Sequence, residues 1–129
     1  MGTCMLWSHD IELQAQPISA SRSRDFVRHH LGEHALSHLS DDLELVVSEL
    51  STNAMVHAAT SFKVSLHAFD ETLLLEVEDG SRDGPTLVAA EVLDTQGRGL
   101  AIVNRLSRGW GVNAHTDGSK SVWAEFSLL

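Results

Sequence analysis

The sequence is short of several residue types, and each shortage excludes a class of protein. Its 129 residues include one cysteine, Cys4, so the chain cannot form an internal disulfide. A reducing compartment, which we take to be the cytoplasm, is therefore the natural setting. No apolar run approaches the roughly 20 residues of a membrane-spanning helix, and residues 1–10 lack the basic start and apolar centre of a signal peptide. We expect no membrane association.

Basic residues are also few. Nine Lys and Arg stand against 18 Asp and Glu, which gives a formal net charge of -9. A protein that binds a nucleic-acid backbone directly needs clustered Lys and Arg, so we expect no direct nucleic-acid partner. With 43% hydrophobic and 21% charged residues the chain is typical of a globular protein. We expect a loose segment at 1–9 and a single domain over 10–129.

One long segment, from about Ser40 to 59–61, carries two different faces of a helix. Ser40 and the acidic residues after it favour a helix start. Glu49 and Asn53 are spaced four apart and form a polar row beside the apolar one. Asn is a poor residue for the middle of a helix, so Asn53 indicates either a solvated edge or a site. The apolar row recurs at steps of three and four and consists of Leu43, Val46, Val47, Leu50 and Ala54.

The remaining elements alternate between strand and helix patterns. Residues 86–96 are mixed and fit a mobile segment with a short helix. The expected order of strand, two helices, two strands, helix and two strands predicts a two-layer α/β sandwich, with a mixed, largely antiparallel sheet covered on one face by helices. The expected elements are a strand at 10–16, a helix from Ser19 or Ser21 to Leu31 that Gly32 stops, strands at 62–69 and 72–77, a helix from Gly97 to Leu106, a strand that residues 109–112 lead into and that ends at His115, and a strand at 121–128.

Four histidines, His29, His30, His34 and His38, are close together near the end of the first helix. His30 and His34 would share one helical face and could ligate zinc, but no neighbouring cysteine or Glu-rich motif completes a ligand set. A solvated turn is the simpler interpretation of this cluster.

Three polar features lie at the ends or edges of predicted elements, where binding sites are usually built. Asn53 offers a neutral oxygen to Mg²⁺, and Glu49, one turn away, could accept a proton. Asp79 follows a buried strand. The glycines of Gly97-Arg98-Gly99 begin a helix, whose free N–H groups suit phosphate oxygens. The segment between Gly80 and residue 96 could close over a ligand.

The order of these features resembles a known family. E-L-S-T-N-A-M-V-H-A at 49–58, V-E-D-G-S at 77–81 and G-R-G-L-A-I-V at 97–103 resemble the N, G1 and G2 boxes of the GHKL ATPase superfamily, whose ATP-binding domain is the Bergerat fold. Within it the chain is similar to the bacterial anti-sigma factor serine/threonine kinases of the RsbW and SpoIIAB type, including the closing S-K-S-V-W-A-E-F at 119–126. The resemblance covers roughly residues 10–128.

The resemblance implies a role for each matching residue. Glu49 would be the general base, Asn53 would tie Mg²⁺ to the ATP phosphates, and Thr52 would lie near those phosphates. Asp79 would accept a hydrogen bond from the adenine amino group. Ser121 would stand in the position of a family threonine beside the adenine. The matching residues that would line the nucleotide site are Gly80, Gly97, Arg98, Gly99, Leu100 and Ser121.

The family also implies partners and a reaction. The protein would phosphorylate a STAS-domain anti-anti-sigma factor, bind a sigma factor in competition with it, and form a homodimer. One departure concerns the G1 box, usually Asp-x-Gly-x-Gly, in which Ser81 replaces the first matching glycine and the second is displaced to Gly84. Because of this departure, a second alternative is a partner-switching module that no longer transfers phosphate. A plain ATP-hydrolysing or histidine-kinase-derived domain is a third alternative.

Overall fold

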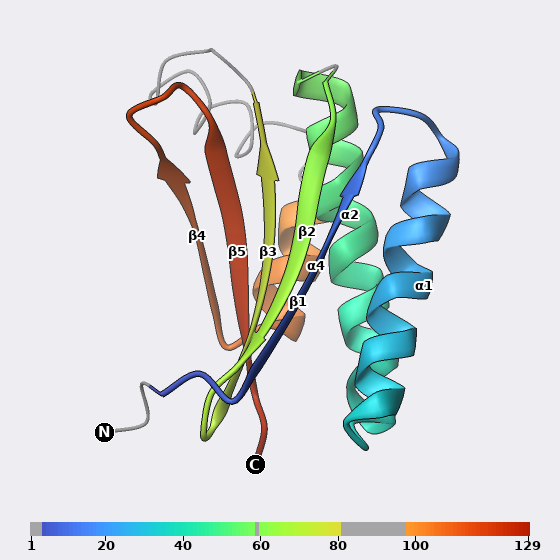
Figure 1. Cartoon of the computed structure of the whole chain (residues 1–129), viewed down its shortest axis with the longest axis vertical. Helices are drawn as coiled ribbons and strands as arrows, with labels where there is room; N and C mark the ends of the chain where they lie inside the picture. The colour runs from blue at the N-terminus through green and yellow to red at the C-terminus, as the bar shows by residue number, and fades with distance from the viewer. Residues whose placement is uncertain (1–3, 59, 81–97) are drawn as a thin grey trace.

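The computed structural model describes residues 4–58, 60–80 and 98–129, with the backbone alone at 57, 58 and 98–100. A five-stranded sheet in the order β1-β2-β3-β5-β4 forms one layer, and each neighbouring pair is antiparallel. Helices α1, α2 and α4 all cover the same face of this sheet (Figure 1). The elements are β1 (Trp7–Leu13), α1 (Ile18–Glu33), the 3₁₀ turn η1 (Ser37–Leu39), α2 (Ser40–Ala58), β2 (Phe62–Ala68), β3 (Thr72–Asp79), α4 (Arg98–Leu106), β4 (Gly109–Ala114) and β5 (Lys120–Ser127).

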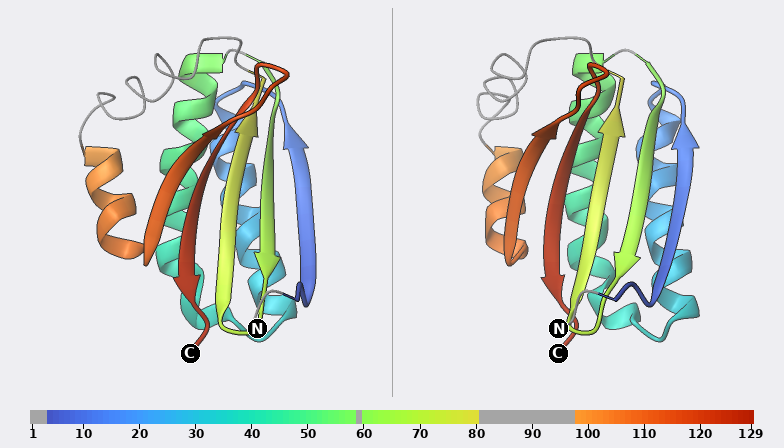
Figure 2. Two further views of the ribbon diagram at one scale, coloured as in Figure 1. Left: turned by 90° about the vertical axis from the view of Figure 1, so that its left-hand side faces the viewer. Right: turned by 60° about the vertical axis from the view of Figure 1, so that its left-hand side comes forward.

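This architecture confirms the predicted two-layer sandwich. Helix α2 lies at the centre of the helical layer, with α1 and α4 on opposite sides of it (Figure 2). Its apolar row is the floor of the core, since none of the five side chains is more than 2% exposed. Burial of each Leu or Val in such a row contributes about 1.5–3 kcal/mol. None of the helices within the described residues is long and apolar enough to cross a membrane.

The sheet follows the predicted alternation. In β3 every second residue is buried from Leu73 to Asp79, and these side chains face the helices. Strand β1 begins at Trp7, three residues earlier than the predicted start at Asp10, and pairs with β2 over its whole length. Strand β4 spans Gly109–Ala114 and so ends one residue before the predicted His115, and β5 begins at Lys120 instead of Ser121.

Helix α1 differs from the prediction at both ends. It starts directly after Pro17, and the Ser19 hydroxyl donates backward to the Gln14 carbonyl at 2.6 Å, so neither Ser19 nor Ser21 is its cap. The helix also continues through Gly32, so the prediction that Gly32 stops it is wrong.

The residue that does reverse the chain after α1 is Ala35, with φ of 59°. The Leu36 N–H donates to the Leu31 carbonyl at 2.8 Å and the Ala35 N–H donates to the Gly32 carbonyl at 3.3 Å. This pair of bonds is the Schellman motif, which usually places glycine where Ala35 stands. A Cβ in the left-handed region costs about 1–2 kcal/mol, so this helix end is strained.

Polar side chains join α1 to the first half of α2. Arg28 donates to Glu44 at 2.7 Å, and the Ser40 hydroxyl donates to the other Glu44 oxygen at 2.5 Å. Burial raises the pKa of the Glu44 carboxyl, but these hydrogen bonds outweigh burial and hold that pKa below its usual range. The Arg24 guanidinium donates to Ser48 one turn further along at 3.1 Å.

Candidate functional site

The polar row of α2 lies on the side of the helix that does not face α1. Glu44 and Ser48 bond to α1. Glu49 follows Glu44, and Asn53 follows Ser48, by five residues, which is about 140° round the helix at roughly 100° per residue. Because α4 packs on α2 opposite α1, the row faces the α4 side (Figure 2). Glu49 and Asn53 are both half-buried. A carboxylate and an amide therefore lie one helical turn apart on the same side of α2.

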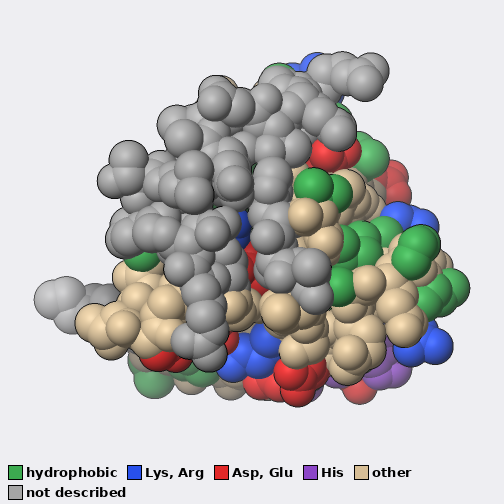
Figure 3. Space-filling model, turned by 90° about the horizontal axis from the view of Figure 1, so that it is seen from above, with side chains coloured by type: hydrophobic (Ala, Val, Ile, Leu, Met, Phe, Trp, Pro, Cys, Tyr) green, Lys and Arg blue, Asp and Glu red, His purple; other side chains and the backbone are tan. Residues whose placement is uncertain are grey.

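Thr52 does not belong to that polar row. It is exposed and lines a shallow apolar hollow between the start of α1 and the end of α2, together with Pro17, Met55 and Val56. Seen from this end of the molecule, hydrophobic side chains gather on the α1 side (Figure 3). The side chain of His57, the next position of the polar row, lies outside the described residues.

Asp79 is the last residue of β3 and is buried, with 3% of its surface exposed. It continues the helix-facing series of Leu75 and Val77, so its carboxylate lies in the layer between sheet and helices. β3 itself packs against α2. A carboxylate at the end of a buried strand is therefore placed as the sequence predicts, on the same side of the sheet as Glu49 and Asn53.

Lys120 is a residue of this region that the sequence did not reveal. It pairs with Asp79 across β3 and β5, and its Nζ lies 3.8 Å from Asp79 Oδ2. Both side chains are buried, and Lys120 Nζ makes no hydrogen bond to any described residue. Lysine is rarely buried, and the predicted strand began one residue later, at Ser121. The signal was present, because Lys120 continues the alternation of Val122 and Ala124 by one step.

Ser121 is not brought to Asp79. Its partner in the register is Glu78, and these two side chains lie on the face of the sheet away from the helices. There the Ser121 hydroxyl bonds with His115 Nε2 at 2.8 Å, and Glu78 lies 3.3 Å from the same nitrogen. The β5 residue that shares the face of Asp79 is Lys120.

The glycine-rich features are described only in part. Gly80 follows Asp79 and is exposed, and a side chain there would lie 3.5 Å from the Thr60 hydroxyl. Helix α4 starts at Arg98, so Arg98, Gly99 and Leu100 form its first turn, although their side chains lie outside the described residues. Gly97, the G1 positions Ser81 and Gly84, and the mixed segment 86–96 also lie outside them.

An open cavity of about 400 Å³ adjoins Asp79 and Gly80. Its other walls come from the ends of β1 and β2 and from the turn before β5, including Glu12, Lys63 and Asp117. Neither Glu49 nor Asn53 is among its described lining residues. Among the described residues, this cavity is therefore lined from the rim of the sheet and not by the polar row of α2.

The fold and these polar groups together define an α/β sandwich with a carboxylate at a strand end and a polar helix row facing the same layer. The sequence model of the histidine kinase-like ATPase domain matches residues 13–125. Because that match spans most of the chain, the protein belongs to the histidine kinase-like ATPase domain family. Membership implies ATP binding, as the sequence predicted.

Structure comparison supports the same fold. The crystal structure described as the RsbU and RsbW domains of Rv1364c from Mycobacterium tuberculosis is similar to this chain, with a TM-score of 0.70 and 20% sequence identity. The match covers 93% of this chain and 32% of that chain, so the protein spans about a third of the length of its neighbour. No curated protein matches the sequence.

Proposed function

We propose that this protein is an ATP-dependent serine/threonine protein kinase that acts as an anti-sigma regulator. The observation that carries the proposal is the buried carboxylate of Asp79, which ends β3 in the layer that the Glu49 and Asn53 row also faces. The family provides an ATP-binding domain on this scaffold. The kinase assignment and the partners go further and rest on the motif resemblance.

In this proposal Asp79 accepts a hydrogen bond from the adenine amino group and so selects adenine over guanine. Glu49 accepts the proton of a serine or threonine hydroxyl as that oxygen bonds to the γ-phosphorus and the bond to the β-phosphate oxygen breaks, releasing ADP. The first turn of α4 directs its free N–H groups at the triphosphate. The nucleotide-lining set is Thr52, Gly80, Gly97, Arg98, Gly99, Leu100 and Ser121, of which Thr52 and Ser121 have the weakest support from their positions.

Magnesium fits the polar row through one residue of this chain. The half-buried Asn53 offers a neutral amide oxygen, and Mg²⁺ prefers hard oxygen ligands shared with phosphates. The ion would neutralise charge on the phosphates. Asn53 would hold it and orient it towards the side of α2 where Glu49 meets the hydroxyl.

The proposed partners follow the resemblance. The phosphorylated protein would be a STAS-domain anti-anti-sigma factor, and its unmodified form would compete with a sigma factor for this chain. A homodimer and a cytoplasmic location complete the proposal. The net charge of -9 is unsuited to direct binding of nucleic acid, so control of transcription would act through protein contacts.

A second function is a partner switch that binds partners without phosphate transfer. Lys120 favours it, because its ammonium lies 3.8 Å from the carboxylate that adenine would need. An ammonium at that distance competes with the adenine amino group for the same carboxylate oxygen, and this competition weakens nucleotide binding. The altered G1 box favours the same alternative.

Phosphate transfer from labelled Mg-ATP to a panel of STAS-domain proteins tests the two functions. We expect labelling of a serine or threonine by the wild type and loss of it in Glu49→Gln, which keeps the side-chain shape and removes the base. Glu71→Gln is the matched control, since Glu71 is exposed in the turn between β2 and β3. It should transfer phosphate like the wild type.

Calorimetry with Mg-ADP separates the remaining outcomes. Nucleotide binding without transfer to any partner would support the partner switch and overturn the kinase. Absence of both binding and transfer would overturn the assigned nucleotide roles of Asp79 and Asn53. Transfer that survives Glu49→Gln would leave nucleotide binding intact and refute Glu49 as the base.

A further inference from the structure

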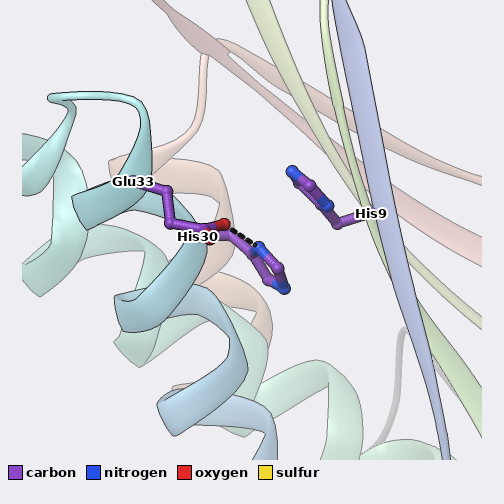
Figure 4. A group of neighbouring side chains, drawn as sticks. All are labelled: His9, His30 and Glu33. Carbon is purple, nitrogen blue, oxygen red and sulfur yellow. Dashed lines mark hydrogen bonds and ion pairs between the residues drawn. The ribbon is translucent and has the colours of Figure 1, made fainter.

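His9, His30 and Glu33 come together between β1 and the last turns of α1. One possible ligand atom from each of the three lies within 4.8 Å of the other two. Figure 4 shows His9 projecting from the strand towards His30 and Glu33 on the helix. Residues far apart in the sequence thus place two imidazoles and a carboxylate at one point in the fold.

The secondary structure explains this convergence. His9 alternates with the exposed Ser8 and Asp10 along β1, so its side chain faces the helical layer. His30 and Glu33 are three residues apart on α1 and share one face of the helix, and His34 follows on the same face. His9, His30 and His34 are all partly buried.

The contacts within the cluster are short. His30 Nδ1 lies 2.7 Å from Glu33 Oε1, and His9 Nε2 lies 3.0 Å from His34 Nε2. The rings of His9 and His30 stack with their centroids 3.9 Å apart. His34 in turn stacks on Trp7 at 3.8 Å, which holds its ring beside the strand.

We propose that His9, His30 and Glu33 bind a divalent transition-metal ion, with zinc the ion that suits them best; His34 contacts His9 but lies outside this group of three. Imidazole nitrogens and a carboxylate oxygen are ligands that zinc takes in proteins. Zinc bonds of about 2.0–2.1 Å place tetrahedral ligands about 3.3 Å apart. The ligand atoms of the three residues lie within 4.8 Å of one another, so the side chains have to close in on the ion to reach that spacing.

Binding requires a modest rearrangement. The His9 and His30 rings are stacked and their planes differ by 14°, so their in-plane lone pairs lie in nearly parallel planes, and one ring has to turn before both nitrogens can bind the same ion. The torsion that turns an imidazole is soft, and the Glu33 side chain is 46% exposed and free to follow. The formal net charge of -9 also favours a cation.

Of the four histidines that cluster in the sequence, His30 and His34 contact His9, and only His30 belongs to the ligand group. His38 is exposed on η1, and His29 is 65% exposed with its Nε2 3.4 Å from the Glu33 oxygen that does not contact His30. His9, which completes the group, comes from another part of the chain. A bound ion would fasten the edge strand β1 to the end of α1, a structural role independent of the proposed kinase.

Zinc titration of the purified chain, by calorimetry or by competition with a coloured indicator, tests this site. We expect one zinc per chain with micromolar affinity. His9→Gln and His30→Gln should each weaken it at least about 100-fold, more than the 10–100-fold typical of a group that only supports a ligand. His38→Gln is the matched control and should bind like the wild type. Zinc at 100 times its dissociation constant should also shift the folding equilibrium about 100-fold towards the native state.

Two results would overturn the site. Binding weaker than millimolar in the wild type would exclude it, as would equal losses in His9→Gln and His38→Gln, which indicate nonspecific surface histidines. Far-ultraviolet circular dichroism checks that the variants fold. If the histidine variants fail that check, Glu33→Gln decides, since its side chain is nearly half exposed; unchanged zinc affinity in Glu33→Gln then refutes the ligand set.

Discussion

Lys120→Met should destabilise the protein because it removes the cation beside a buried carboxylate. At 3.8 Å and an effective dielectric constant of about 20, the attraction between Lys120 Nζ and Asp79 Oδ2 is about 4 kcal/mol. Methionine keeps the length and apolar character of the lysine stem. The variant therefore retains most of the packing and leaves the Asp79 carboxylate buried without this ammonium, a change that typically costs 3–5 kcal/mol.

A double-mutant cycle isolates the pair from the other contacts of each residue. Asp79→Asn leaves Lys120 buried without its anion, so it should also lower the free energy of unfolding by about 3 kcal/mol. The double variant contains neither charge and should lose about 2–3 kcal/mol less than the sum of the single losses. Urea denaturation followed by the fluorescence of the three tryptophans measures each value, with an unchanged slope against urea as the check on two-state unfolding. Losses that add to within about 0.5 kcal/mol would refute the ion pair as a source of stability.

The same variants separate the structural role of Asp79 from its proposed role in adenine recognition. Mg-ADP at 100 times its dissociation constant should stabilise the wild type by about 2.7 kcal/mol. Lys120→Met should keep that stabilisation or increase it, because the adenine amino group no longer competes with the ammonium for Asp79. Asp79→Asn should lose it at the same nucleotide concentration, since an amide accepts a hydrogen bond less strongly than a carboxylate.

Two further predictions concern α1 and its contact with α2. Ala35→Gly should raise the free energy of unfolding by about 0.5–1 kcal/mol in urea denaturation, because glycine relieves the left-handed strain. Part of that gain is lost to the larger conformational entropy of glycine in the unfolded state. A loss of stability would contradict the helix-end assignment. Glu44→Gln should cost about 1 kcal/mol at pH 7. The folded-state pKa of Glu44 is lowered, so its contribution is complete above the unfolded value of about 4.3 and disappears as the pH falls through the folded one. A difference from wild type that does not shrink as the pH falls below about 4.3 would contradict this.

The sequence predicted the parts of the fold that depend on local periodicity. The apolar row of α2 and the alternation in β3 required no knowledge of the partners across the core, because the period itself specifies which face is buried. The ends of α1 were not predictable in the same way. Gly32 looked like a stop signal, whereas the helix continued one residue and placed Ala35, which carries no signal of its own, in the left-handed position.

Register explains what the sequence missed in the candidate site. Asp79 could be predicted because it follows a buried strand. Whether Lys120 or Ser121 shares its face depends on the pairing of β3 with β5, which a one-residue shift would invert. His9 was missed because residues 1–9 were expected to be loose, whereas β1 begins at Trp7 and pairs with β2, which turns His9 towards α1. Contacts between distant segments, rather than local pattern, determine these positions.

The two proposed cation sites lie at opposite ends of the sandwich and call for different ions. His9 and His30 sit at the end of α1, where β1 begins, whereas Asn53 and Asp79 lie near the ends of α2 and β3 (Figure 1). Imidazoles select zinc, and the Asn53 oxygen suits magnesium. A general chelator removes both ions, so loss of phosphate transfer on chelation says nothing about the histidine site. A zinc-selective chelator in excess magnesium distinguishes them: if transfer falls while the native fraction stays constant, the two ends are coupled through the packing of α1 on α2, and if only stability falls they are independent.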